Sequence, residues 1–340
     1  MTPRPTLVYL LTREMFTACF RPIDVRRLEA AVEPIGGPMA TPQDIPPPEV
    51  LGRADIILTC WGSPPIKGSL LATSRRLKFV MHAAGSVRHL VDEELWRCGV
   101  RLSSCNHALA IGVAEMILGF LIVAGKRGWT LPRLVRDGHW SRNTPELEVE
   151  RRERIIEMFD ITVGVISASR VGRHLCNLLR NFEVRTLLYD PYVTEDEARE
   201  LGADRADLDD LLRRSDMVSL CAPALPETRH LLGARHFSLM KDGAIFVNTS
   251  RGQNVDESAL VDELQKGRLF AVIDVTDPEP PPENHPFLRL PNVVVTPHIA
   301  GHAANGRFRQ GKYAVDEILR FVRGEKLVNE ITPHRLATMA

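Results

Sequence analysis

The turn sequence GVISASRVG at residues 164–172 is the first candidate for ligand-binding chemistry in this chain. An apolar run, ITVGVIS, leads into it, and an amphipathic run, RVGRHLCNLLRNF, leads out of it. A strand, a glycine-rich turn and a helix in this order bind the pyrophosphate of a dinucleotide at the helix N-terminus. Here serines stand at the first two glycine positions, Ser167 and Ser169, and Gly172 is retained. The surrounding pattern favours a dinucleotide site, while the loss of two glycines counts against one.

The two serines predict a weakened turn rather than an abolished one. If Ser167 must adopt a positive φ angle, strain of about 1–3 kcal/mol is expected. Ser169 brings a Cβ toward the pyrophosphate, although its hydroxyl can donate a hydrogen bond in return. Arg170 adds positive charge beside the phosphates, next to the free N–H groups at the start of the helix. We therefore expect Ser169, Arg170 and Val171 to bind a dinucleotide.

Asp190 ends the next apolar run, LLYD. In dinucleotide-binding folds an acidic residue at this place accepts hydrogen bonds from the ribose hydroxyls of adenosine. An aspartate that precedes a proline, as Asp190 precedes Pro191, can equally be a turn residue that ends a strand. The local sequence leaves both interpretations open.

Short apolar runs alternate with helical or turn-rich segments along the chain, which predicts parallel sheets covered by helices. The segment 108–125 is apolar but contains Glu115, so we expect a buried helix rather than a membrane span. A charged connection over 136–160 follows it, and the proline-rich segment 277–286 should be a loop. The strand-like runs are TLVYLL, ADIILTC, LKFVMHAA and VRLSSC before that helix, and ITVGVIS, VRTLLYD, MVSLCAP, AIFVNTS, LFAVIDV and NVVVTPH after it.

Composition narrows the class of protein. A length of 340 residues predicts about two domains, and 43 basic residues balanced by 43 acidic ones offer no electrostatic reason to expect a nucleic-acid or membrane partner. The six cysteines form no C-x-x-C pair and the histidines show no metal-ligand spacing, so we expect reduced thiols and no metal. Arg13 and Glu14 interrupt the first apolar run, which fits a strand better than a cleaved signal. These features predict a cytoplasmic protein with a small-molecule partner.

Three segments in the second half carry a family resemblance: GAIFVNTSRGQNVDESALVDELQKGRL, AVIDVTDPEPPPENHP and LPNVVVTPHIAGH. With them the chain closely resembles the D-isomer-specific 2-hydroxyacid dehydrogenase family, which includes glyoxylate/hydroxypyruvate reductases and 3-phosphoglycerate dehydrogenases. The resemblance implies two doubly wound α/β domains: a Rossmann NAD-binding domain at 108–302, inserted in a flavodoxin-like substrate domain split into 1–107 and 303–340. It also implies NAD as cofactor, a small D-2-hydroxy acid or 2-oxo acid as substrate, and a homodimer that pairs through the long helix and GHWSRNTPELEVE.

The resemblance places the family's catalytic residues on Arg251 in NTSRG, Glu279 in DPEP and His298 in TPHIAG. An arginine can bind a substrate carboxylate through two parallel hydrogen bonds. A histidine can donate a proton to the carbonyl oxygen in reduction and remove it in oxidation, and a carboxylate beside it favours its protonated form. Each residue alone could instead be a helix cap, a loop carboxylate or a turn histidine. Together, at strand ends of a parallel sheet, they favour catalysis.

The resemblance assigns binding roles to three further segments. CAPALPETRHLLG is similar to the family's loop near the adenosine, and HAAGSVRHLV is similar to the loop whose N–H groups bind the substrate carboxylate. Asp274 in IDV resembles the residue that contacts the nicotinamide carboxamide, although it could also cap a strand end. The implied cofactor-binding residues are Ser169, Arg170, Val171, Asp190, Cys221, Ala222, Pro223, Thr228, Thr249 and Asp274, and the implied substrate-binding residues are Ala84, Gly85, Ser86 and Arg251.

The chain departs from the family after the substrate loop, where Val87 and Arg88 replace a common Asp-Asn pair. Arg88 could reach a second substrate carboxylate or phosphate, or form a structural salt bridge. Trp61 in CWGSPP could line the pocket or pack in the core. The family also includes transcriptional corepressors that can retain the arginine, glutamate and histidine. An NAD(H)-gated binding protein is therefore the alternative to an enzyme, and turnover of a 2-oxo acid would distinguish them.

Overall fold

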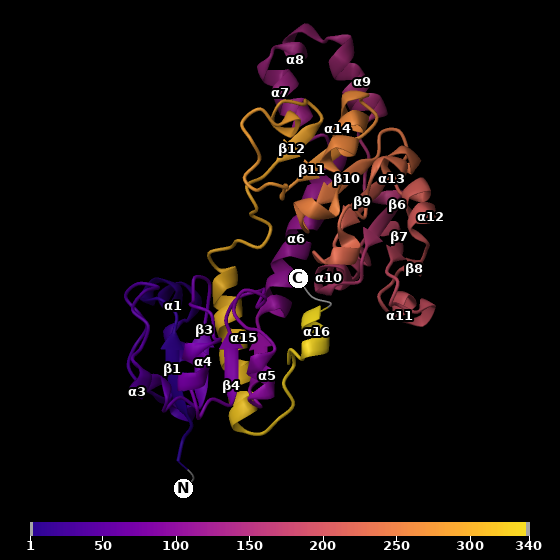
Figure 1. Ribbon diagram of the computed structural model, residues 1–340. Helices are drawn as coiled ribbons and strands as arrows, with labels where there is room; N and C mark the ends of the chain where they lie inside the picture. Colours follow the sequence, from indigo (N-terminus) through magenta and orange to yellow (C-terminus); the bar gives the residue numbers. More distant parts are fainter. Residues whose placement is uncertain (1–2, 338–340) are drawn as a thin grey trace. The chain divides into compact units, whose positions relative to one another are not determined.

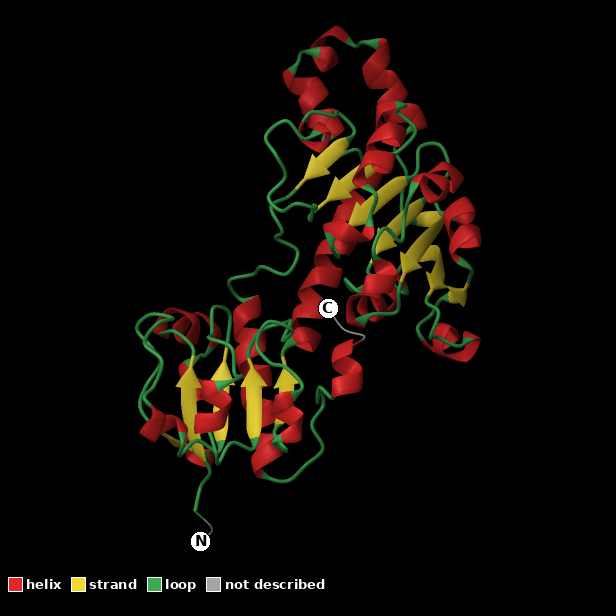
Figure 2. Ribbon diagram, viewed as in Figure 1, coloured by secondary structure: helices red, strands yellow, loops and turns green. Residues whose placement is uncertain are grey.

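A computed structural model describes residues 3–337 and divides the chain into two compact units (Figures 1 and 2). The first unit combines the segment up to Leu109 with the segment from His302 onward. The second unit runs from Ala110 to Gly301. Because the first unit is built from both ends of the chain, the second unit is an insertion within it.

The first unit contains a parallel sheet with the strand order β2-β1-β3-β4-β5, which is the flavodoxin-like order. Every residue of β3 and β4 is buried, since helices cover both faces of a parallel sheet. This burial explains why these strands are continuous apolar runs in the sequence. The strands are β1 (Thr6–Leu10), β2 (Glu33–Pro34), β3 (Ile56–Thr59), β4 (Phe79–His82) and β5 (Arg101–Ser104).

The C-terminal helix α15 (Gly306–Val322) packs on α1, α2 and β4 of the first unit. Gly311 makes this contact possible, because a Cβ there would lie 1.9 Å from the carbonyl oxygen of Cys19. The other helices of this unit are α1 (Arg13–Cys19), α2 (Pro22–Ala31), α3 (Pro48–Leu51), α4 (Ser69–Thr73), α5 (Glu94–Arg97) and α16 (Pro333–Ala337).

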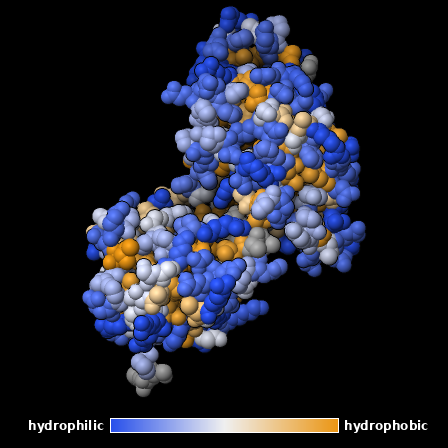
Figure 3. Space-filling model, viewed as in Figure 1, coloured by the Kyte–Doolittle hydropathy of each residue, from blue (hydrophilic) through white to orange (hydrophobic). Residues whose placement is uncertain are grey.

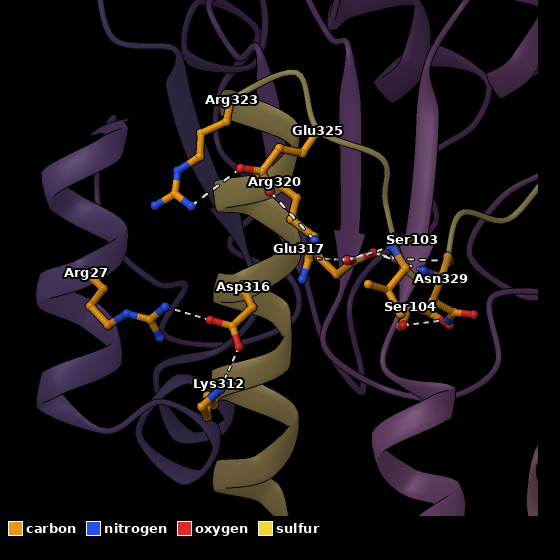
Figure 4. A network of polar contacts seen from close by, with 11 residues as sticks. Arg27, Ser103, Ser104, Lys312, Asp316, Glu317, Arg320, Arg323, Glu325 and Asn329 are labelled. Carbon is orange, nitrogen blue, oxygen red and sulfur yellow. Dashed lines mark hydrogen bonds and ion pairs between the residues drawn. The ribbon is translucent and has the colours of Figure 1, made fainter.

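Glu317 joins the C-terminal segment to β5 through a buried polar network (Figure 4). Its carboxylate accepts a hydrogen bond from the Ser103 hydroxyl at 2.9 Å. It also accepts hydrogen bonds from the backbone N–H groups of Val328 and Asn329, at 3.0 and 3.2 Å. A buried carboxylate requires such donors, because an unpaired buried charge is costly. The network therefore holds the residues that follow α15 close to β5.

The second unit contains a parallel sheet with the strand order β12-β11-β10-β9-β6-β7-β8. The chain moves outward from β6 in one direction to β8 and then in the other direction from β9 to β12. Between β6 and β9 lies the switch point where Rossmann-type sheets bind dinucleotides. The strands are β6 (Phe159–Ile166), β7 (Glu183–Tyr189), β8 (Asp204–Arg205), β9 (Met217–Leu220), β10 (Ile245–Asn248), β11 (Phe270–Ile273) and β12 (Val293–Val295).

The long helix α6 (Asn106–Gly125) has the length and hydropathy of a membrane-spanning helix, but part of its surface is buried in protein. Ile117, Phe120 and Leu121 pack in the core of the second unit with residues of β6 and β10. We therefore describe α6 as a core helix. The remaining helices are α7 (Thr130–Arg136), α8 (His139–Arg142), α9 (Pro145–Glu153), α10 (Arg170–Leu179), α11 (Glu195–Glu200), α12 (Leu208–Arg214), α13 (Ala234–Leu239) and α14 (Glu257–Gln265), with 3-10 turns η1 (Pro226–Thr228), η2 (Gly252–Asn254) and η3 (Pro286–Leu288).

Candidate active site

The turn after β6 contains a serine in a strained backbone conformation. Ser167 adopts a φ angle of +83°, in the region that favours glycine. Its N–H donates to the carbonyl oxygen of Tyr189 at 2.7 Å, and its hydroxyl donates to Oδ2 of Asp190 at 3.2 Å. These bonds to the end of β7 hold the serine in its strained conformation.

Ser169 and Gly172 shape the start of α10. Ser169 is the N-cap, and its Oγ accepts a hydrogen bond from the N–H of Gly172 at 3.3 Å. Gly172 cannot carry a side chain, because a Cβ there would lie 2.0 Å from the carbonyl oxygen of Ser167. The N–H group of Val171 lies in the first turn, where a helix offers it no acceptor. The turn therefore presents a backbone N–H donor at a helix N-terminus, as an anionic pyrophosphate requires.

Asp190 holds the turn from the end of β7. Its Oδ2 accepts hydrogen bonds from the Ala168 N–H at 2.8 Å and from the Ser167 hydroxyl, and its Oδ1 accepts from the Tyr192 N–H at 2.9 Å. Each carboxylate oxygen has about two acceptor sites, so Oδ1 keeps one for a ribose hydroxyl. The structure thus shows Asp190 as a turn residue and leaves room for the predicted contact with adenosine.

The loop after β9 is fixed by its neighbours. Cys221 and Ala222 are buried, and the Cys221 N–H donates to the carbonyl oxygen of Ile166 at 2.9 Å. Nδ2 of Asn254 donates to the carbonyl oxygen of Ala222 at 2.9 Å. The hydroxyl of Thr228 donates to the carbonyl oxygen of Pro223 at 2.6 Å. Sequence reasoning did not identify Asn254, whose only signal was its place three residues after Arg251.

Thr249 and Asp274 follow β10 and β11 at the same edge of the sheet. The Thr249 hydroxyl is buried and has no hydrogen-bond partner among the described residues, so it is available to a ligand. Asp274 accepts from the Thr296 hydroxyl at 2.5 Å and the Ile299 N–H at 2.8 Å through Oδ1, and from the Ala300 N–H at 2.9 Å through Oδ2. It therefore caps the turn after β12, and Oδ2 keeps one acceptor site.

Glu279 and His298 form a hydrogen-bonded pair, as predicted for a carboxylate beside the imidazole. Oε1 of Glu279 lies 2.6 Å from Nδ1 of His298, and each side chain is 42% exposed. His298 has a φ angle of +51°, in the left-handed region, and its N–H donates to the carbonyl oxygen of Asp274 at 2.9 Å. Because Glu279 engages Nδ1, the accessible ring nitrogen for proton transfer is Nε2.

Arg251 follows β10 and lies partly buried in the second unit. Burial lowers the pKa of Arg251, and the negative charge of Glu279 opposes this shift. Nη1 of its guanidinium donates to the carbonyl oxygen of Ser250 at 2.6 Å. This is the one hydrogen bond that the guanidinium makes to a described residue. The remaining guanidinium N–H groups could bind a substrate carboxylate.

The predicted substrate loop follows β4 in the first unit. The Ala84 carbonyl oxygen accepts from the Cys105 N–H at 2.9 Å, and over residues 3–337 no acceptor pairs with the N–H groups of Gly85 and Ser86. His82 ends β4, directly before the loop, and is fully buried with its Nδ1 2.9 Å from the Thr59 hydroxyl. Burial, with a smaller contribution from the nearby His89, lowers the pKa of His82 to about 3. The loop therefore begins directly after an uncharged, buried histidine that sequence reasoning did not identify.

Trp61, which follows β3 in the first unit, is partly exposed rather than packed in the core. The guanidinium of Arg307 lies over its ring at 5.9 Å from the centroid, which is a cation–π contact. The structure therefore contradicts a pure core role for Trp61.

Comparisons with known proteins identify relatives that cover most of the chain. A sequence model described as D-isomer specific 2-hydroxyacid dehydrogenase, NAD binding domain, matches residues 118–300. D-3-phosphoglycerate dehydrogenase of Methanocaldococcus jannaschii is 29% identical over 285 residues, which cover 83% of this chain and 52% of that protein. Glyoxylate reductase of Korarchaeum cryptofilum is 32% identical over 273 residues, which cover 78% of this chain and 80% of that protein. D-mandelate dehydrogenase of Rhodotorula graminis shares the fold with a TM-score of 0.79 at 23% identity, covering 97% of this chain and 98% of that one.

These similarities agree with the architecture described above. The matched NAD-binding segment, residues 118–300, lies within the second unit and includes β6 to β12. The predicted fold class is confirmed by the two parallel sheets and by the shared fold. The chain spans about half the length of the two phosphoglycerate dehydrogenases that it matches.

Proposed function

The chain belongs to the D-isomer specific 2-hydroxyacid dehydrogenase family, and from this membership we propose that it is an NAD(H)-dependent oxidoreductase. It would transfer a hydride between nicotinamide and a small D-2-hydroxy acid or 2-oxo acid. The observation that carries this proposal is the 2.6 Å Glu279–His298 pair, which lies in the same unit as Arg251 and the NAD-binding segment. No comparison favours the alternative of an NAD(H)-gated corepressor.

Each of the three residues has a distinct role. Arg251 binds the substrate carboxylate through charge-assisted hydrogen bonds and so orients the carbonyl group. Nε2 of His298 donates a proton to the carbonyl oxygen in reduction and accepts it in oxidation. Glu279 holds the imidazole ring through Nδ1 and so directs Nε2 to the substrate. When bound, the nicotinamide supplies or accepts the hydride, which no side chain can do.

The described residues fit a dinucleotide. The helix N-terminus at Val171 and the absence of a side chain at Gly172 suit the pyrophosphate. The unpartnered hydroxyl of Thr249 and the remaining acceptor site of Asp274 suit polar groups of the nicotinamide end. The loop that carries Cys221, Ala222, Pro223 and Thr228 would lie near the adenosine. We assign NAD binding to the second unit, and the first unit carries the loop at Ala84, Gly85 and Ser86 that the family resemblance assigns to the substrate.

A panel of 2-oxo acids with NADH, followed by the absorbance of the reduced nicotinamide, tests the proposed activity. We expect turnover of at least one small 2-oxo acid and none of a matched compound that lacks the carboxylate. NADH binding without turnover of any 2-oxo acid would instead support the binding-protein alternative.

We expect the protein to prefer NADH over NADPH. The Asp190 carboxylate can accept a hydrogen bond from the ribose hydroxyls but repels a 2′-phosphate, and the segment DPYVTEDE after it offers no arginine to receive that phosphate. The measurement is kcat/KM for both cofactors with one 2-oxo acid. Equal or better use of NADPH would show that Asp190 does not select the cofactor.

Replacing Ser167 by glycine should strengthen NADH binding. Glycine removes strain of about 1–3 kcal/mol at the φ angle of +83°, partly offset by loss of the hydroxyl bond to Asp190. Ser169 is a matched comparison, because Ser169→Gly relieves no such strain and weakens the N-cap only slightly. Fluorescence titration with NADH should show tighter binding in Ser167→Gly, by up to about tenfold per 1.4 kcal/mol, and little change in Ser169→Gly. Unchanged or weaker binding in Ser167→Gly would mean that the turn carries no releasable strain.

We also propose that the protein is a homodimer in the cytoplasm. Large apolar side chains are exposed on α6 to α9, and Figure 3 shows apolar patches within a mainly hydrophilic surface. The exposed apolar residues of this region are Val123, Val135, Trp140 and Val149. Such patches suit a protein interface. Light scattering at micromolar concentration should give about twice the 38.1 kDa chain mass.

The proposed cytoplasmic location is supported by the cysteines. All six are free thiols, which suits a reducing compartment.

A further inference from the structure

The segment that carries Glu279 runs from Thr276 to His285 between β11 and η3 without regular secondary structure. We call this segment the Glu279 loop. Glu279 and His298 come from different segments of the chain, so the position of this loop decides whether the two side chains meet. The contacts that fix the loop therefore bear directly on the candidate acid–base pair.

One side chain, that of Glu257 at the start of α14, contacts both ends of the Glu279 loop. Its Oε1 accepts a hydrogen bond from the backbone N–H of Asp277 at 3.0 Å. Its Oε2 lies 3.2 Å from Nε2 of His285, and the Glu257 and His285 side chains are 13% and 16% exposed. A single, largely buried carboxylate thus bridges the start and the end of the loop, with Glu279 between the two contacts.

The hydrogen bonds of His285 indicate which ring nitrogen carries its proton. Nδ1 of His285 accepts a hydrogen bond from the N–H of Phe287 at 3.3 Å. A nitrogen that accepts is unprotonated, so the proton of the neutral ring lies on Nε2, which is 3.2 Å from Oε2 of Glu257. The carboxylate of Glu257 therefore accepts a hydrogen bond at the start of the loop and lies in close polar contact with a ring N–H at its end. A protonated carboxyl group has fewer acceptor sites and no charge, so it would hold the loop less firmly.

The segment that carries Arg251 packs against the same end of the loop. A Cβ at Gly252 would lie 2.1 Å from the carbonyl carbon of Thr276 and 2.5 Å from the nitrogen of Asp277, so the two backbones touch. Glu257 follows Gly252 by five residues and adds a side-chain contact to this backbone contact. The Glu279 loop is therefore tied to the Arg251 segment at two places.

Burial makes Glu257 sensitive to pH. Burial raises the pKa of Glu257 to about 7, the hydrogen bond from Asp277 N–H opposes the shift, and the negative charge of Asp277 adds to it. Burial lowers the pKa of His285, so this ring is neutral at pH 7. Arg229 also lies on this side, with its Nη1 3.8 Å from Oδ2 of Asp277, and Asp256 beside Glu257 interacts with His230. The carboxylate thus changes charge in the range where activity is measured.

We propose that Glu257 is a positioning residue, which clamps both ends of the Glu279 loop and so keeps Glu279 within hydrogen-bond distance of His298. The role in catalysis rests on the proposed oxidoreductase function. The clamp itself rests only on the contacts within the second unit. Loss of the clamp should slow proton transfer at His298 and leave the dinucleotide turn intact, because that turn is built from the residues after β6.

Glu257→Gln tests this role, because the amide keeps the size of the side chain and removes its charge. Glu283→Gln is the matched control, since Glu283 lies in the same loop and is exposed. In Glu257→Gln we expect kcat to fall by about 10- to 100-fold, because small misplacements of catalytic groups have effects of this size. The NADH dissociation constant should stay unchanged. Hydrogen exchange measured by mass spectrometry should become faster in residues 276–285, and the control should match the wild type in all three measurements.

The pH profile separates positioning from a general structural defect. In the reduction direction, kcat/KM of the wild type should rise through about pH 7 as Glu257 ionises. The rising limb should be absent in Glu257→Gln. An unchanged pH profile and unchanged loop exchange in this variant would overturn the proposed role. Faster loop exchange in a protein that reduces no 2-oxo acid would support the clamp and contradict the proposed enzyme function.

Discussion

Replacing Arg251 by alanine is expected to lower kcat/KM for a 2-oxo acid by about 10²- to 10⁴-fold, equivalent to roughly 3–5 kcal/mol of lost transition-state stabilisation. The guanidinium donates a single hydrogen bond to a described residue, the Ser250 carbonyl, so its other N–H groups are available to a carboxylate. Alanine removes both the charge and the orientation that two parallel hydrogen bonds impose on the substrate. Steady-state kinetics with the best substrate of the panel measures the effect.

Two further variants show whether the effect of Arg251→Ala is specific. Arg251→Lys keeps the charge but cannot form two parallel hydrogen bonds, so it should recover only part of the activity. Arg235→Ala removes an exposed arginine of α13 that pairs with Asp209 of α12 and has no role in the candidate site, so it should leave kcat/KM unchanged. NADH affinity should be the same in all three proteins. A near-wild-type kcat/KM for Arg251→Ala would make Arg251 a structural residue.

His298→Asn should lower kcat by about 10²- to 10⁴-fold, because the reaction loses its general acid. Asparagine is chosen because it tolerates the left-handed backbone better than most residues, and His298 has a φ angle of +51°. The expected change falls mainly on kcat, since the substrate carboxylate is still bound by Arg251. His334→Asn, at an exposed position of α16, provides the control and should behave as the wild type.

Several features of this protein were determined by the sequence alone. Buried parallel strands appear as continuous apolar runs, because helices cover both faces of the sheet, and these runs located β1, β3 to β7 and β9 to β12. The segments around Arg251, Glu279 and His298 indicated the family, which the comparisons confirm. A positive φ angle at Ser167 was one of two possibilities that the sequence left open, and the structure shows it.

Other features depended on the tertiary structure. The two-residue strands β2 and β8 lie at sheet edges and leave no recognisable pattern in the sequence. Asp190 and Ser167 are 23 residues apart, and their hydrogen bond exists because β6 and β7 are neighbours in the sheet. Glu257 reaches Asp277 and His285 because Gly252 lets two backbones touch. Local patterns record which side chains are buried, whereas contacts between distant residues follow from the order of the strands and the close approach of their loops.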